Sequence, residues 1–99
     1  MSTRHNDLKK AVHSMLNDVV EQCFQRMIHH PEDASDLNGI IKDATDEINY
    51  QVLKLEANQS VNDPVKLDEI HRVVSKDTHK KSMELLRKLQ HLQKSQKSA

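Results

Sequence analysis

The sequence predicts an all-α protein, a small antiparallel bundle of three helices, or of four if one polar gap is a break. Three observations support this prediction. Apolar residues recur at helical spacing in three separate stretches of the 99 residues. One glycine and two prolines leave little material for the tight turns of β-hairpins. Only Phe24 and Tyr50 are aromatic, so aliphatic side chains must build the core of a single domain spanning 1–99.

The longest apolar pattern runs from Leu8 to Ile28 and predicts a helix that begins at Asn6 or Asp7 and ends at the histidines before Pro31. Its apolar residues form two rows at steps of four: Leu8, Val12, Leu16, Val20, Phe24, Ile28 and Ala11, Met15, Val19, Cys23, Met27. Each row rotates by about 40° per step on a 3.6-residue helix. Either two neighbours therefore cover different parts of this helix, or part of it is an oligomer surface.

The second predicted helix follows an acidic connector and ends near residues 57–58. Its apolar positions are Leu37, Ile40, Ile41, Ala44, Ile48, Val52 and Leu55. Asp33, Ser35 and Asp36 are all suitable N-cap types, and the start of the apolar pattern favours Ser35 or Asp36.

The third predicted helix begins with Asp63 as N-cap and Pro64 in the first helical position. Its pattern of Val65, Leu67, Ile70, Val73 and Val74 resumes at Met83, Leu85, Leu86, Leu89 and Leu92. Between them, residues 75–82 carry no apolar side chain. They form either the middle of one long helix, with Thr78 and Lys81 covering its inner face, or a break before a fourth helix. In one continuous helix Val74, Thr78, Lys81 and Leu85 would lie on the same face, and this favours the long helix.

The two ends of the chain, 1–5 and 94–99, are expected to be unstructured, the second because its residues are polar and mostly small. No apolar run resembles a signal peptide or a membrane span, so a cytoplasmic protein without membrane contact is expected. The single cysteine, Cys23, forms no intrachain disulfide and is interpreted as a small buried hydrophobe.

Charge is unevenly distributed although the formal net charge is zero. Residues 32–63 carry two basic and eight acidic side chains, whereas residues 64–99 carry nine basic and four acidic ones. These two segments either pack against each other or each bind an external partner. Internal complementarity is the preferred interpretation.

Catalytic, cofactor-binding and metal-binding motifs are absent from the sequence. A single glycine excludes the glycine-rich loops that hold phosphates, and no serine or cysteine nucleophile motif occurs. The seven histidines match no zinc-binding spacing. We therefore predict no catalytic residues, no cofactor and no metal, and keep a small enzyme or metal protein using His29, His30 or Asp33 as an alternative.

The predicted function is a non-catalytic helical module for protein–protein interaction or self-association, of unknown biological process. The rotating stripe of the first helix motivates it, because one partner helix cannot cover such a stripe. The candidate partner-binding residues lie where the stripe ends: Val20, Phe24, Met27 and Ile28. A homo-oligomer is expected.

An alternative function is association with nucleic acid through the basic last helix. The candidate phosphate-binding residues are Lys76, Lys80, Lys81, Arg87 and Lys88. Against this alternative, the segment contains no aromatic side chain for base stacking, and the isoelectric point is near neutral.

Overall fold

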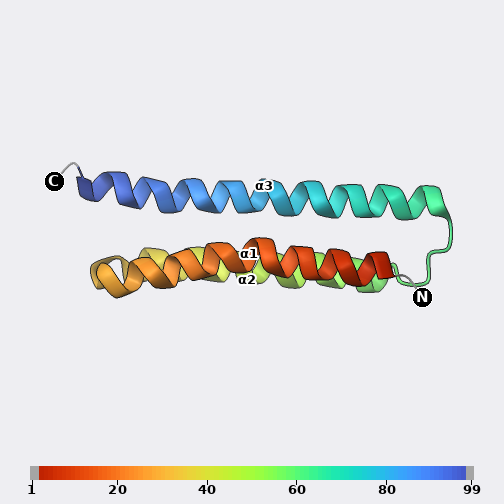
Figure 1. The fold of residues 1–99 in the computed structure, drawn as a ribbon, viewed down its shortest axis with the longest axis horizontal. Coiled ribbons are helices and arrows are strands. Elements are labelled where there is room, and N and C mark those ends of the chain that lie inside the picture. The colour runs from red at the N-terminus through yellow and green to blue at the C-terminus, as the bar shows by residue number, and fades with distance from the viewer. Residues whose placement is uncertain (1–2, 98–99) are drawn as a thin grey trace.

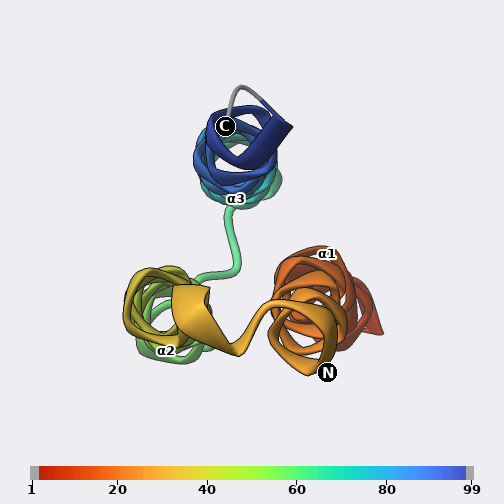
Figure 2. The same cartoon turned by 90° about the vertical axis from the view of Figure 1, so that its left-hand side faces the viewer.

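The computed structural model describes the backbone of residues 3–97 and the side chains of residues 4–93. This part of the chain forms α1 (Thr3–His29), a short 3₁₀ turn η1 (Pro31–Asp33), α2 (Ala34–Ala57) and α3 (Pro64–Lys97), with no strand. The three helices pack side by side into a rod of 55 × 18 × 16 Å (Figure 1). Viewed end-on, they occupy the corners of a triangle, and each contacts the other two (Figure 2). The predicted all-α bundle is confirmed, with three helices rather than four.

The helices α1 and α3 run in the same direction and in register. His5 contacts His71 at one end of the rod, and Arg26 contacts Leu92 at the other; both pairs are 66 residues apart. Because the same sequence separation holds at both ends of the rod, the register between α1 and α3 is the same along most of their length. Up-down-up connectivity requires such a parallel pair, because α2 runs the opposite way between them (Figure 1).

Two ion pairs mark the antiparallel seam between α2 and α3. Lys54 Nζ lies 3.7 Å from Asp77, and Lys88 Nζ lies 3.5 Å from Asp43. The residue numbers in both pairs sum to 131, as antiparallel register requires. The acidic and basic segments therefore do lie against each other, although Lys54–Asp77 has the reverse polarity.

The core side of α1 consists of Val12, Leu16, Val19 and Cys23, all at most 1% exposed. Their alternating spacing of four and three residues keeps them facing the other two helices along the whole contact. As predicted, the two apolar rows at steps of four rotate away from this buried line along α1. In the first row, Val12 and Leu16 are buried, whereas Phe24 and Ile28 further along are exposed.

The start of α2 differs from the prediction. The helix begins at Ala34, directly after the 3₁₀ turn, so Asp33 is the N-cap residue and Ser35 and Asp36 lie inside the first turn. The Asp33 side chain makes no capping hydrogen bond. Its carboxylate instead accepts a hydrogen bond from Arg26 of α1. A tertiary contact has therefore outcompeted the local capping interaction on which the prediction relied.

The helix α3 begins as predicted and continues without a break. The Val65 N–H donates to Asp63 Oδ1 at 3.0 Å, which is an N-cap hydrogen bond with Pro64 in the first helical position. Residues 75–82 are helical throughout, and Thr78 is 1% exposed on the core side. The long-helix interpretation of the polar gap is thus confirmed.

The ends of the helices extend further than expected. Residues 3–5 belong to α1 and residues 94–97 to α3, whereas 1–5 and 94–99 were expected to be unstructured. Residues 1–2 and 98–99 lie outside the described residues. At the first end the physical reason is His5, which is 4% exposed and packs against His71. This long-range contact orders a turn that is polar by sequence.

A polar layer interrupts the core midway along the rod. Gln51 of α2 and Thr78 and Ser82 of α3 are all buried. Antiparallel register places Gln51 level with residue 80, between the other two. Gln51 Nε2 donates to Glu47 at 2.7 Å, but Gln51 Oε1 and Thr78 Oγ1 have no hydrogen-bond partner among the described residues. Two unsatisfied buried oxygens reduce stability.

We predict that Thr78→Val stabilises the protein. Valine has nearly the shape of threonine, so the change removes an unsatisfied hydroxyl without creating a cavity, and the free energy of unfolding should rise by about 1 kcal/mol. Urea denaturation measures it. The matched control is Thr45→Val, at an exposed position of α2 whose hydroxyl donates to the Ile41 carbonyl at 2.9 Å, where no gain in stability is expected. A destabilised Thr78→Val protein would mean that the hydroxyl is hydrogen-bonded.

Candidate functional site

The outer face of α1 carries an apolar patch at its carboxyl-terminal half. Phe24 is 53% exposed and Ile28 is 72% exposed, and a separation of four residues makes them neighbours on the helix surface. Val20 and Met27 are half-buried and pack against the core. The patch is thus continuous with the core, and the structure brings all four predicted partner-binding residues to one region of α1.

A second exposed apolar pair lies on α2, where Tyr50 is 56% and Leu53 is 64% exposed. It differs from the Phe24 and Ile28 patch in its surroundings. The Lys54 ammonium lies 5.2 Å from the centre of the Tyr50 ring, a cation–π contact that already partners the aromatic face. The α1 patch is therefore the better candidate for a protein contact.

The five predicted phosphate-binding residues of α3 divide into two groups. Lys81 and Lys88 lie on the side that faces α2, where Lys88 pairs with Asp43 and Lys81 pairs with Glu84 at 3.9 Å. These two charges are at least partly neutralised within the chain. They are weaker candidates than the sequence indicated, because each phosphate contact would have to compete with a carboxylate.

Lys76, Lys80 and Arg87 form the other group, and all three are exposed. Spacings of four and seven residues place all three on one helix face. Among the residues with described side chains, none of the three makes an ion pair. Arg87 also borders an open groove of about 470 Å³ between α2 and α3, which is lined in addition by Asp36, Ile40, Lys88, His91 and Leu92. The structure therefore supports this basic face of α3 as a candidate phosphate-binding surface.

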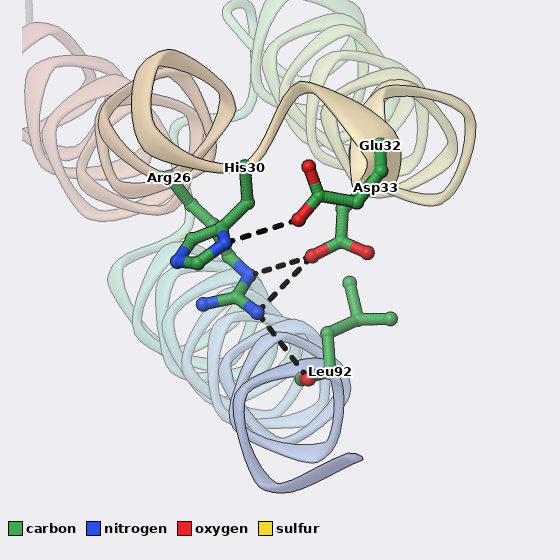
Figure 3. Close-up of polar contacts among 5 residues, drawn as sticks. All are labelled: Arg26, His30, Glu32, Asp33 and Leu92. Atoms are coloured by element: carbon green, nitrogen blue, oxygen red, sulfur yellow. Dashed lines mark hydrogen bonds and ion pairs between the residues drawn. The ribbon is translucent and has the colours of Figure 1, made fainter. Parts of the chain in front are cut away.

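A buried arginine organises the corner between α1, η1 and the end of α3 (Figure 3). The Arg26 side chain is 9% exposed; its Nε and Nη2 atoms both lie 3.1 Å from Asp33 Oδ2, and Nη2 donates to the Leu92 carbonyl at 3.3 Å. His30 and Glu32 pair beside it at 3.1 Å. Sequence patterns gave no indication of this cluster, because the interhelical partner of Arg26 is a backbone carbonyl.

A buried histidine pair joins all three helices at the opposite end of the rod. His5 Nδ1 lies 2.5 Å from His71 Nε2, and His5 Nε2 faces the Asn58 carbonyl at 3.4 Å. Burial, followed by the nearby His5 and Arg4, lowers the pKa of His71 below its ordinary value of 6.5. The sequence missed this pair because residues 66 apart share no local pattern.

The groups considered for metal binding or nucleophilic chemistry do not assemble into a site. The part of the chain that the structure describes holds no group of three or more His, Cys, Asp or Glu side chains placed to bind a metal. His29 is exposed, and His30 is paired with Glu32. Cys23 is fully buried, and its burial raises the pKa of the thiol, which disfavours the reactive thiolate.

Comparison of the chain with protein-family models, with curated proteins and with solved structures finds no match. Within the described residues, no helix is long and apolar enough to cross a membrane. The function must therefore be inferred from the exposed surfaces themselves: the apolar patch on α1 and the basic face of α3.

We predict that Asp33→Ala destabilises the protein by about 1–3 kcal/mol in urea denaturation, because it leaves the buried Arg26 charge without its carboxylate. The matched control is Asp46→Ala, which removes a carboxylate from an exposed ion pair with Lys42 and should change stability little. Equal effects of the two variants would contradict a structural role for Arg26 and Asp33.

Proposed function

We propose that this chain is a non-catalytic helical interaction module that associates through the outer face of α1, with a second copy of the chain as its partner. The observation that supports the proposal is the exposure of Phe24 and Ile28, beside half-buried Val20 and Met27. Burial of large apolar side chains in the centre of an interface supplies most of the free energy of protein association. In an isolated chain, the exposed side chains of Phe24 and Ile28 add little to the stability of the fold.

A second copy is the simplest partner for this patch. A two-fold axis would place Phe24 and Ile28 of one copy against the same residues of the other, so one sequence feature supplies both sides of the contact. Exposed uncharged residues, such as Asn17 and Gln25, accompany the patch on α1. Glu21, which is exposed three residues before Phe24, is the acidic neighbour of the patch, so a two-fold contact must keep the Glu21 side chains of the two copies at its solvent-exposed edge.

We predict that the double variant Phe24→Glu/Ile28→Glu weakens self-association at least about tenfold, as measured by sedimentation equilibrium. Both side chains are exposed, so the helical circular dichroism signal should be unchanged.

The matched control is Met83→Glu, which introduces the same charge at an exposed methionine of α3 and should leave association intact. Wild-type protein that stays monomeric at every concentration would refute self-association. A monomer that binds a different protein through Phe24 and Ile28 would retain the surface and change the partner.

Nucleic-acid association is a second candidate function, favoured by one observation. Lys76, Lys80 and Arg87 share an exposed face of a continuous 34-residue helix and make no ion pair among the described side chains. Such a row of cations can contact the phosphates of a duplex without reading its sequence.

For this candidate we predict binding to duplex DNA that weakens steeply with salt. Replacing Lys76, Lys80 and Arg87 by alanine should reduce the slope of log affinity against log salt by about 2.7, since each phosphate contact contributes about 0.9. Replacing Lys81 and Lys88, which already pair with carboxylates, is the control and should change the slope less. No binding at low salt removes this candidate.

A further inference from the structure

The contact between His5 and His71 lies where the first turns of α1 meet α3 and the end of α2. Both side chains are more than nine-tenths buried, and their ring centres are 4.6 Å apart. His5 Nε2 faces the Asn58 carbonyl, and a carbonyl can only accept, so the hydrogen-bond geometry assigns a proton to Nε2. In the neutral His5 ring, Nδ1 then carries the lone pair, which accepts from His71 Nε2–H.

Starting from two neutral rings, the His5–His71 contact can accommodate protonation of one ring but not of both. While either ring is neutral, it offers one lone pair, and the N–H···N contact can form. Once both rings are charged, all four nitrogens carry hydrogens, so two donors and two positive charges face each other in a buried contact.

The surrounding charges provide little compensation for a charged pair. From α1, Arg4 adds a positive charge close by, and its guanidinium is bound to Asp68 of α3 at 2.7 Å. Asp7 and Arg72 line the groove beside His71 with opposite charges. From α2, the contact is the Asn58 carbonyl.

One further ion pair joins α1 to α2 one helical turn after His5. Glu56 is engaged by Lys9 at 3.6 Å. Asp68 and Glu56 thus already have basic partners, and Asp7, which is exposed on α1, is the remaining carboxylate beside the pair.

We propose that the His5–His71 pair is an acid-sensitive latch, which holds the first turns of α1 against α3 at neutral pH and releases them when both rings are protonated. The latch lies at the end of the rod opposite the Arg26 corner, so release opens one end of the bundle and leaves the other closed (Figure 1).

The direction of the pH dependence follows from linkage. The pKa of His71 is lowered in the folded protein, chiefly by burial, then by His5 and Arg4, with Asp68 opposing. The opened state, with an ordinary imidazole pKa near 6.5, therefore binds more protons over the interval below that value. The contact stabilises the closed state above about pH 6.5, and this contribution is lost as the pH falls through the lowered pKa.

Amide hydrogen exchange at about pH 7.5 and about pH 5.5, corrected for intrinsic rates, tests the latch. The opening constant of the first turns of α1 should rise by up to about tenfold between these values, since one proton is taken up on opening. Amides near Arg26 and Leu92 should keep their protection. His71→Gln should remove the pH response, whereas His79→Gln, at an exposed position of the same helix, should retain it.

If His71→Gln does not fold, the wild-type imidazoles provide the test through their NMR titrations. The pKa of His71 should lie below the ordinary imidazole value of 6.5. The proposal is overturned if the pKa of His71 is not lowered, if opening is independent of pH, or if His71→Gln keeps the full response. It is also overturned if added Zn²⁺ protects the first turns of α1 and abolishes the acid response, because the pair would then be a metal site.

Discussion

Burial of one continuous line on α1 is the constraint on which the rest of this bundle depends. Val12, Leu16, Val19 and Cys23 are shielded from water only when α2 and α3 lie against α1 together. Fully burying each valine or leucine side chain contributes about 1.5–3 kcal/mol, which is a large share of the stability of a domain this small. The chain has few aromatics to enlarge its core. It therefore relies on long helices with aliphatic residues along most of their length.

Polar contacts determine how these aliphatic surfaces align. Apolar packing alone tolerates a slip by one helical turn, because leucine, valine and isoleucine are similar in size and shape. The Arg26 corner and the His5–His71 pair sit at opposite ends of α1 and α3, and the histidine pair can form at only one register of the two helices. The polar layer of Gln51, Thr78 and Ser82 disfavours slips of α2 in the same way, since a slip would bury it against leucine. The buried polar layer lowers the stability of the bundle but favours one register of α2 against α3.

The same geometry explains which surfaces remain for function. A row at steps of four rotates out of a contact that follows a seven-residue repeat, so Phe24 and Ile28 emerge from the core line that Val12 and Leu16 occupy. On α3, Lys88 pairs with Asp43 of α2 and Lys81 pairs with Glu84 of its own helix, whereas Lys76, Lys80 and Arg87 are exposed and make no ion pair among the described side chains. The proposed dimer contact, the basic face and the histidine latch occupy different parts of the rod, so each can be tested separately.

Local patterns in the sequence were sufficient to predict the helix class, the Asp63–Pro64 start of α3 and the rotation of the α1 stripe, which leaves Phe24 and Ile28 exposed. These features depend on residues within a few turns of one another, where spacing fixes position. Only the tertiary structure placed Asp33 on Arg26 instead of on its own helix, ordered the turn at His5 and paired Lys88 of α3 with Asp43 of α2. Each of these outcomes joins residues that are distant in sequence or belong to different helices. Their energies arise from burial and charge pairing, which exist only after the three helices have packed.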